Sequence, residues 1–249
     1  MVVSMNDIYQ QGTIYQSDNR KTIYLTPEEP LVYDTNKWAY KIMPTIDSWK
    51  LDIAYQQYMH EQQSSSHLAF TFPENENLDQ QWLDEINALG FELGIMELYA
   101  IEPCDINRSK YNDIEVVIVN DMTLEDYIAI YRKFAEPYGV AYANESIQLI
   151  RNQFDTENRL RIIAYKDNTP VGILDLIVGE TTVEIDGFGV LTQFQRQGIG
   201  AVMQSFVAEI ANDKTIILIA DGEDSAKNMY IKQGYIFISY CYQVLKEHI

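Results

Sequence analysis

The chain has 249 residues and a formal net charge of −19, from 18 basic and 37 acidic side chains. This excess of acidic side chains would repel the phosphates of DNA or RNA, so we expect no nucleic-acid partner. Either attraction of a cationic molecule or solubility alone would account for the negative charge. No apolar run approaches the roughly 18 residues that span a bilayer, and no secretory signal is recognisable. The two cysteines lie far apart, which suits reduced thiols. We therefore expect a cytoplasmic protein of one large or two modest domains, without membrane contact.

The first 110 residues show few periodic patterns before Tyr40, and Pro27 and Pro30 predict a turn there. From Tyr40 on, the apolar patterns predict strands that alternate with helices. Asn77 is expected to cap the second helix, and Gly90 to end it. The predicted strands are 38–43, 68–72 and 93–101, and the predicted helices are 49–60 and 77–89.

Residues 111–183 contain a longer series of predicted elements. Thr123 opens a helix whose first turn carries Glu125 and Asp126, which suit the positive end of the helix dipole. Pro137 and Gly139 end that helix, and a shorter one follows at 145–152. The turn at 166–168 joins two apolar strands as a β-hairpin. The predicted strands are 114–119, 160–165 and 171–178.

The most informative segment joins the strand that holds Glu184 to the next helix. Gln195 is followed at short spacing by Gly198 and Gly200, so two glycines stand where an amphipathic helix begins. Glycines there let the backbone approach an anion, and the unpaired N–H groups of the first turn attract it. A P-loop would end in Gly-Lys-(Ser/Thr), and a dinucleotide fold would need a third glycine. The segment is therefore typical of a different phosphate-binding turn.

The last third continues with a buried strand at 215–220, a helix from about Asp224 to Gly234, and an aromatic-rich strand at 235–245. Two of its motifs resemble those of a known family. Gln195-x-x-Gly198-x-Gly200 resembles the (Gln/Arg)-x-x-Gly-x-(Gly/Ala) signature of the GNAT superfamily of N-acetyltransferases. Its second signature, Ala-x-x-Leu-Tyr-x-Lys-x-Gly-(Phe/Tyr), is similar to Ala226-x-x-Met229-Tyr230-x-Lys232-x-Gly234-Tyr235.

The resemblance covers residues 111–249 and implies a catalytic GNAT domain there. The implied fold is α/β (α+β), with a mixed, mostly antiparallel twisted sheet flanked by helices, and acetyl-CoA is the implied acyl-donor substrate. No metal site is expected. The residues expected to contact acetyl-CoA are Phe188, Gly189, Val190, Gln195, Arg196, Gln197, Gly198, Ile199, Gly200, Ala201 and Asn228.

Acetyl transfer to an amine needs a proton acceptor, because an ammonium group has no lone pair for the attack. The resemblance assigns this role to Glu184, and burial of its carboxyl group would favour proton uptake. Asp186 lies on the same face of the strand, so the choice between the two carboxylates stays open. The backbone N–H of Val190 is the expected donor to the oxyanion, and Tyr230 is the expected acid for the departing thiolate. Transfer is expected to be direct, without an acyl-enzyme.

The strand–helix–strand pattern of residues 68–101 is similar to that of residues 216–245. We therefore interpret residues 1–110 as a degenerate GNAT-like domain, so that two related domains stand in tandem. Between Pro44 and Ser48, where the corresponding loop would lie, there is no glycine, so this domain is expected to lack a cofactor loop. The alternative is an extension of unknown role.

The sequence thus predicts an N-acetyltransferase that moves an acetyl group from acetyl-CoA to a primary amine of a small cationic molecule or a protein. The alternative is a catalytically weak acyl-CoA-binding protein that serves as a sensor or scaffold. The identity of the acceptor stays open, as does the choice between a monomer and a homodimer.

Overall fold

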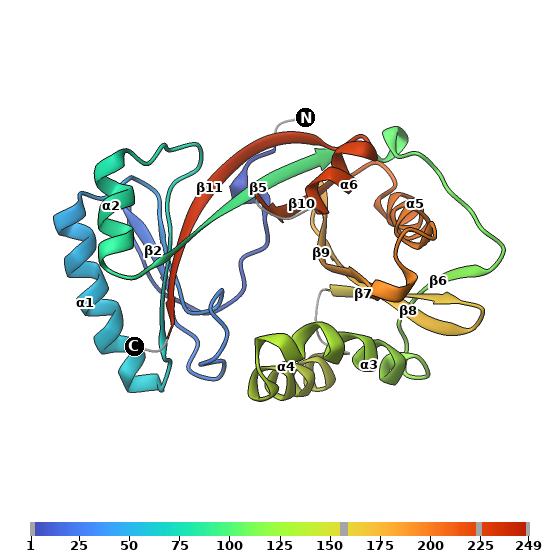
Figure 1. Cartoon of the computed structure of the whole chain (residues 1–249), viewed down its shortest axis with the longest axis horizontal. Coiled ribbons are helices and arrows are strands. Elements are labelled where there is room, and N and C mark those ends of the chain that lie inside the picture. The colour runs from blue at the N-terminus through green and yellow to red at the C-terminus, as the bar shows by residue number, and fades with distance from the viewer. Residues whose placement is uncertain (1–2, 155–158, 223–225, 248–249) are drawn as a thin grey trace. The chain divides into compact units, whose positions relative to one another are not determined.

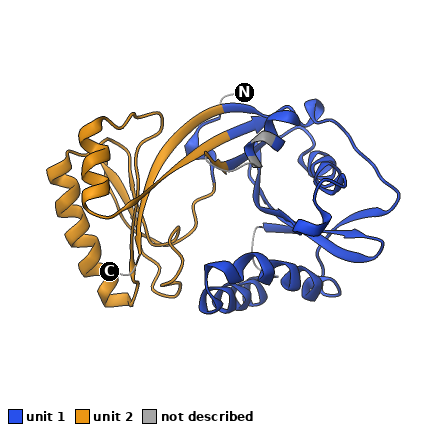
Figure 2. Ribbon diagram, in the orientation of Figure 1, with its two compact units in different colours: residues 1–8, 99–219, 225–237 blue, residues 9–98, 220–224, 238–249 orange. Residues whose placement is uncertain are grey.

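The computed structural model describes residues 3–154, 159–222 and 226–247, apart from the side chains of Ala226 and Asn228 (Figure 1). The chain divides into two compact units, each made of several segments. Unit 1 comprises residues 1–8, 99–219 and 225–237, and unit 2 comprises residues 9–98, 220–224 and 238–249 (Figure 2).

The strands are β1 (Ile14–Ser17), β2 (Lys21–Tyr24), β3 (Trp38–Tyr40), β4 (His67–Thr71), β5 (Glu92–Ile101), β6 (Ile114–Ile118), β7 (Arg159–Lys166), β8 (Thr169–Val178), β9 (Thr182–Val190), β10 (Thr215–Asp221) and β11 (Ile236–Glu247). The helices are α1 (Ile46–Gln63), α2 (Gln80–Ala88), α3 (Leu124–Ala135), α4 (Val140–Gln153), α5 (Ile199–Ala211) and α6 (Ala226–Lys232). Short 3-10 turns lie between them, among them η4 (Thr192–Phe194). None of the helices in the described part of the chain is long and apolar enough to cross a membrane.

In unit 2 the strand order is β1-β2-β3-β4-β11-β5, and β3 and β4 pair in parallel on either side of α1 in the sequence. The core of this unit is rich in aromatic side chains. The Trp49 ring lies 5.2 to 6.0 Å from four other rings, measured between centroids: Phe70, Phe72, Trp82 and Phe91. Aromatic pairs at such distances add about 0.5–1.5 kcal/mol each beyond the burial of their area. Unit 2 is therefore stabilised by a dense aromatic core.

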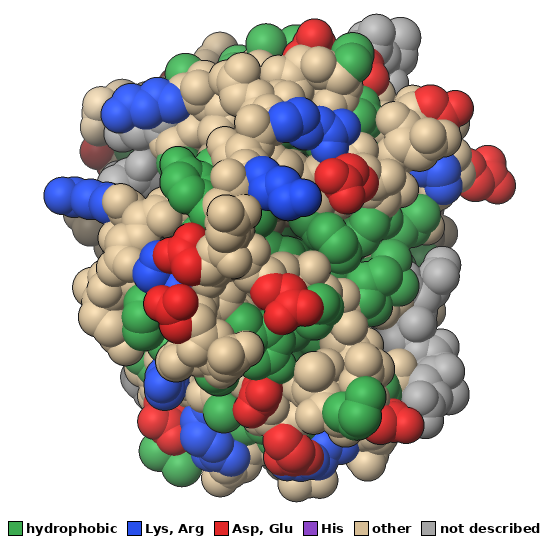
Figure 3. Space-filling model, turned by 90° about the vertical axis from the view of Figure 1, so that its right-hand side faces the viewer, with side chains coloured by type: hydrophobic (Ala, Val, Ile, Leu, Met, Phe, Trp, Pro, Cys, Tyr) green, Lys and Arg blue, Asp and Glu red, His purple; other side chains and the backbone are tan. Residues whose placement is uncertain are grey.

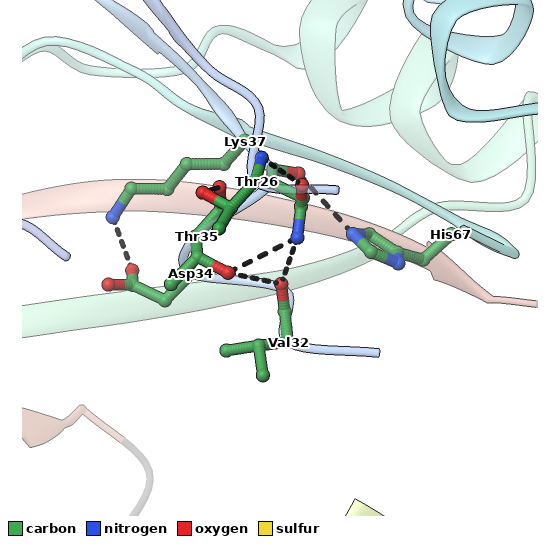
Figure 4. Close-up of polar contacts among 7 residues, drawn as sticks. Thr26, Val32, Asp34, Thr35, Lys37 and His67 are labelled. Carbon is green, nitrogen blue, oxygen red and sulfur yellow. Dashed lines mark hydrogen bonds and ion pairs between the residues drawn. The ribbon is translucent and has the colours of Figure 1, made fainter. Parts of the chain in front are cut away.

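A buried polar network closes the loop between β2 and β3. The amide of Asn36 accepts a hydrogen bond from the Thr26 backbone N–H at 2.8 Å and donates to the Val32 carbonyl at 2.9 Å. His67 Nε2 lies 3.3 Å from the Asn36 carbonyl, and Thr35 adds further bonds (Figure 4). Because these polar groups are paired inside the fold, they fix the loop at little cost in desolvation.

In unit 1 the strand order is β5-β10-β9-β8-β7-β6; β9 and β10 pair in parallel, whereas the pairs from β9 through β8 and β7 to β6 are antiparallel. Helices α3 and α4 cover one face of this sheet and α5 covers the other (Figure 1). The faces can be told apart at two glycines of adjacent strands. A Cβ on Gly189 would meet Phe134 of α3, whereas a Cβ on Gly172 would come within 3.3 Å of Met203 of α5. The predicted mixed, mostly antiparallel, helix-flanked fold is confirmed.

Several predicted element ends differ from the structure. The strands β1 and β2 were not predicted: β1 is exposed along its whole length, and β2 is buried at three successive residues, so the side chains of neither strand alternate between buried and exposed. The N-cap of α2 is Asp79, whose carboxylate accepts from the Trp82 N–H at 3.0 Å; Asn77 instead accepts from the Tyr240 hydroxyl at 2.8 Å. The predicted start of the last helix near Asp224 lies outside the described residues.

The two compact units do not divide at residue 110. Residues 99–110 lie in unit 1, whereas residues 220–224 and 238–249, from the predicted C-terminal domain, lie in unit 2. The physical reason is strand pairing: within unit 2, β11 pairs with β4 from Gln243↔Thr71 to Glu247↔His67. The end of the chain therefore completes the sheet of the unit that holds the N-terminal helices.

Candidate functional site

The glycine turn joins β9 to α5 through η4. Arg196 and Gly198 both have positive φ angles, 60° and 86°, which place them in the left-handed region. Gly198 is the N-cap of α5 and supplies no side-chain hydrogen bond to the first turn. The first N–H groups of the helix therefore have no side-chain cap and can bind an anion together with the positive end of the helix dipole.

The two glycines of the motif have different reasons to be glycine. A Cβ on Gly198 would lie only 2.7 Å from the ring of Tyr111, in addition to the strain of the positive φ angle. A Cβ on Gly200 would lie 3.5 Å from Phe188 and 3.7 Å from the Met229 sulfur, which is ordinary contact. Gly198 is thus the position that tolerates a side chain least. Tyr111 could not be singled out from the sequence, because no local pattern links it to this turn.

The amides of the turn brace the loop itself. Gln195 Nε2 donates to the Val190 carbonyl at 3.0 Å, and Gln197 Nε2 donates to the Gln193 carbonyl at 3.1 Å. Arg196 is exposed, Ile199 is buried, and Ala201 lies in the first turn of α5. The loop therefore presents backbone N–H groups, while its two glutamines hold its shape.

A β-bulge in β9 turns the strand at Gly187, whose φ angle is 57°. The register with β8 changes from Asp175↔Asp186 to Ile173↔Gly189, so β9 has one extra residue there. Glu184 and Asp186 consequently face α3, whereas Phe188 and Val190 face α5 and α6. The contacts agree with this, since the Phe188 ring lies 6.4 Å from that of Tyr230 of α6.

The backbone N–H of Val190 points toward the edge of β9 that faces β10. The Leu191 N–H donates to the Val171 carbonyl of β8 at 2.9 Å, and N–H groups of successive strand residues point to opposite edges. Between the described residues of β9 and β10 the register runs only from Thr182↔Thr215 to Ile185↔Leu218. The end of β9 thus offers backbone groups at an edge where this ladder has stopped.

Tyr230 is buried, with 7% of its surface exposed. Its ring centroid lies 5.6 Å from that of Tyr235, whose hydroxyl donates to Gln204 Oε1 of α5 at 2.6 Å. Burial raises the pKa of Tyr235, and Tyr230 adds to the effect. Tyr230 therefore lies beside Phe188, on the α5 and α6 side of the sheet. Asn228 belongs to α6, but its side chain lies outside the described part of the structure.

The carboxylates on the α3 side differ in their surroundings. Glu184 is 8% exposed, whereas the Asp186 side chain is 47% exposed and forms an ion pair with Arg159 at 2.7 Å. Arg159 could not be found from the sequence, because its partner Asp186 lies in a different strand and no motif contains Arg159. The structure thus brings Glu184 and Asp186 to one face, and Phe188, Val190 and Tyr230 to the other.

Acidic side chains do not gather into one patch on the face in Figure 3, where Lys and Arg side chains lie among Asp and Glu. The net charge of −19 therefore says little about a binding surface on this face. Among the described residues, no group of His, Cys, Asp and Glu side chains could hold a metal ion.

Comparison with known proteins agrees with this geometry. Residues 127–235 match the Acetyltransferase (GNAT) family, and residues 3–99 match a domain of unknown function, DUF5613. This C-terminal region therefore belongs to the GNAT family of acetyltransferases. Over nearly its whole length, the chain is similar to a functionally unknown conserved protein from Staphylococcus epidermidis ATCC 12228, with 44% identity and a TM-score of 0.95 over 99% of this chain and 98% of that chain. No curated protein matches the sequence.

Two more distant structures are similar in fold. A GCN5-related N-acetyltransferase from Kribbella flavida has 15% identity and a TM-score of 0.63, over 94% of this chain and 90% of its own. A tandem GNAT protein from the clavulanic acid biosynthesis pathway has 8% identity and a TM-score of 0.54, over 86% of this chain and 75% of its own. The fold of the whole chain thus fits two related GNAT-like domains in tandem.

Proposed function

We propose that the protein is an N-acetyltransferase that moves an acetyl group from acetyl-CoA directly to a primary amine. The observation that carries this proposal is the N-terminus of α5, which lacks a side-chain cap and follows Gly198 at a positive φ angle within the GNAT region. A free first turn of this kind binds the phosphates of a ligand through backbone N–H groups. The catalytic domain is proposed to be residues 111–249.

Acetyl-CoA is proposed to bind along the end of β9 and the start of α5. Its pyrophosphate would contact the backbone from Gln195 to Ala201, with Arg196 as an added cation. Its pantetheine arm would pair with the backbone of Phe188, Gly189 and Val190, at the edge where the ladder with β10 has ended. Asn228 is proposed to complete the site from α6.

The proposed chemistry uses both sides of the sheet. Glu184 takes a proton from the acceptor ammonium, and the neutral amine then forms a C–N bond to the thioester carbonyl carbon. The Val190 N–H stabilises the oxyanion until the C–S bond breaks. Tyr230 gives its proton to the thiolate, and the proton that the amide nitrogen loses restores the phenol through solvent. Glu184 releases the proton that it took to solvent, so the products are an acetamide, free CoA and one proton, and atoms and charge balance.

The acceptor is proposed to be a small cationic amine or an amino group of a protein, because a cation suits a site with two carboxylates on one face. A catalytically weak acyl-CoA sensor or scaffold is the second candidate, and it is favoured by the interaction of Asp186 with Arg159, which occupies one of these carboxylates.

Turnover measurements separate the two candidates. The full chain is incubated with acetyl-CoA and a panel of polyamines, amino sugars, amino acids and lysine peptides, while free CoA thiol is measured and acetylated products are identified by mass spectrometry. An acetyltransferase produces CoA and one acetylated acceptor in equal amounts. Binding of acetyl-CoA without transfer to any acceptor would instead identify the sensor or scaffold.

A further inference from the structure

Gly189 of β9 lies directly against the ring of Phe134, which comes from the last turn of α3. A Cβ on Gly189 would lie 2.7 Å from two carbon atoms of that ring and 3.2 Å from a third. The backbone itself does not demand a glycine here, because the positive φ angle of β9 belongs to Gly187 and not to Gly189. A glycine inside a strand often marks the close approach of another group. The ring of Phe134 is therefore what requires a glycine at position 189.

The side of β9 that Phe134 covers is apolar around Gly189. Ile173 is the partner of Gly189 on β8, and Leu191 lies two residues further along the chain; both are buried. They belong to one apolar cluster, against which the partly buried rings of Phe134 and Phe194 pack. The Phe134 ring is thus held by apolar neighbours at a point where β9 has no side chain of its own.

The opposite side of β9, which faces α5 and α6, is filled by side chains of the strand itself. A Cβ on Gly172 would lie 3.2 Å from Val190 Cγ2 and 3.3 Å from the Met203 sulfur, so Val190 packs toward α5. The Phe188 ring lies 6.4 Å from that of Tyr230 of α6, measured between centroids. The two sides of the strand end therefore differ: one carries bulky side chains, and the other is bare backbone under a single ring.

This difference bears on the acyl group of the donor. The proposed oxyanion contact places the thioester carbonyl at the N–H of Val190, the residue that follows Gly189. An acyl chain on that carbonyl would lie beside the Gly189 backbone, on the side where the strand has no side chain and Phe134 lies. Acetyl has a single methyl group there, whereas a longer chain would have to displace the ring. Displacement of a ring that packs against buried neighbours is costly, because protein interiors are close-packed.

We propose that Phe134 is a specificity-determining residue that limits the transferred acyl group to acetyl. The inference rests on the proposed function and adds to it the residue that sets the size of the donor. One methylene group in an apolar pocket changes kcat/KM by about ten- to two-hundredfold. Butyryl-CoA has two more methylene groups than acetyl-CoA, so its kcat/KM should be at least about a hundredfold lower.

The test compares acetyl-CoA, propionyl-CoA and butyryl-CoA as donors, and measures kcat/KM and the dissociation constant of each with the full chain. Phe134→Ala should raise kcat/KM for butyryl-CoA relative to acetyl-CoA by at least about tenfold, and Phe134→Leu should raise it less. Phe154→Ala removes another partly buried ring from the same cluster and is the matched control, which should keep the wild-type ratio. Because each ratio compares two donors on one variant, a loss of folded protein cancels from it.

A second measurement tests the contact between the ring and the strand without any donor. Gly189→Ala should lower the melting temperature of the wild-type chain more than it lowers that of Phe134→Ala, because the new Cβ meets the ring only where the ring is present. Equal losses in the two backgrounds would show that the ring does not lie on Gly189, and the inference would be overturned.

The donor ratios also separate this inference from the proposed function. An unchanged ratio in Phe134→Ala, or a wild-type chain that uses butyryl-CoA as well as acetyl-CoA, would overturn the role of Phe134 and leave acyl transfer standing. If the chain binds acyl-CoA but transfers no acyl group, the proposed function fails instead, and the ratio of dissociation constants decides the role of Phe134. Binding of none of the three donors would overturn both.

Discussion

Helices α1 and α5 occupy equivalent positions in the two units, since each follows one strand of a parallel pair and precedes the other. Their N-termini differ. The N-cap of α1 is Thr45, whose hydroxyl accepts from the Ser48 N–H at 3.2 Å, whereas the N-cap of α5 is Gly198, which caps nothing. The first turn of the helix in unit 2 is thus capped by a side chain, whereas the first turn of the helix in unit 1 has no side-chain cap. We call unit 2 closed and unit 1 open, after the presence or absence of this side-chain cap.

The largest expected effect comes from a side chain placed in the open turn. Gly198→Glu should abolish acetyl-CoA binding in isothermal titration calorimetry, because the new Cβ meets Tyr111 at 2.7 Å and the carboxylate repels phosphate. Thr45→Glu at the equivalent position of unit 2 is the control and should leave the affinity unchanged. Equal affinity in wild type and Gly198→Glu would show that the phosphates bind elsewhere.

A substitution of Tyr230 distinguishes a role in the chemical step from a role in acetyl-CoA binding to the open unit. Tyr230→Phe keeps the packing against Phe188 and Tyr235 but removes the acidic proton, so kcat should fall on the order of a hundredfold. The dissociation constant of acetyl-CoA should stay within about twofold. Tyr235→Phe removes only a hydrogen bond to Gln204 and is the matched control. A loss of affinity equal to the loss of kcat would mean that Tyr230 only shapes the pocket.

The closed unit is expected to respond to acid. His67 is 1% exposed, and its burial, with a smaller contribution from His60, lowers its pKa to about 4. The His67 imidazole therefore binds a proton more tightly in the unfolded chain than in the folded one. The contribution of His67 to the free energy of unfolding is therefore fully present above pH 6.5. It is lost as the pH drops toward 4, which lowers the free energy of unfolding by about 3 kcal/mol. His60 acts in the same direction. His67→Phe should flatten the dependence; an unchanged slope in that variant would exclude His67 as its source.

All three tryptophans of the chain, Trp38, Trp49 and Trp82, lie in unit 2, so tryptophan fluorescence reports the unfolding of that unit. Urea titrations at several pH values therefore measure the acid response of the closed unit without a label. Acetyl-CoA should not shift these transitions if it binds to unit 1 and the units unfold independently.

The smallest expected effect is loss of the cap that closes α1. Thr45→Ala should lower the free energy of unfolding by about 1 kcal/mol in the same fluorescence assay, because the Ser48 N–H loses its partner. Thr45→Ser keeps the hydroxyl and is the control, with little expected change. A destabilisation equal in both variants would point to the lost methyl group rather than to the cap.

The open turn was predictable from the sequence because its signal is local: Gln195, Gly198 and Gly200 stand within six residues at the start of an apolar helix. The hairpin of β7 and β8 was predictable for the same reason. The bulge at Gly187 was not, since a glycine alone does not reveal a register shift against β8. The ion pair of Arg159 with Asp186 depends on strand pairing between residues far apart in the sequence. Such contacts exist only once the sheet has formed.

The chain segments that make up unit 2 could likewise be predicted only where their signal is local. Its helices and central strands were predicted from their apolar patterns, but β11, which completes its sheet, follows the second signature of the other half of the chain. Gln243 of β11 pairs with Thr71 of β4, about 170 residues earlier in the sequence. No local sequence pattern can predict a strand partner at that separation. The predicted boundary at residue 110 therefore differs from the compact units of the structure.

The number of acetyl-CoA molecules bound per chain tests the contrast between the two units most directly. Isothermal titration calorimetry of the full chain should give one equivalent per chain, with none in Gly198→Glu and one in Thr45→Glu. Two equivalents per chain, or one equivalent that survives Gly198→Glu and disappears in Thr45→Glu, would contradict the assignment of the ligand to the turn of unit 1.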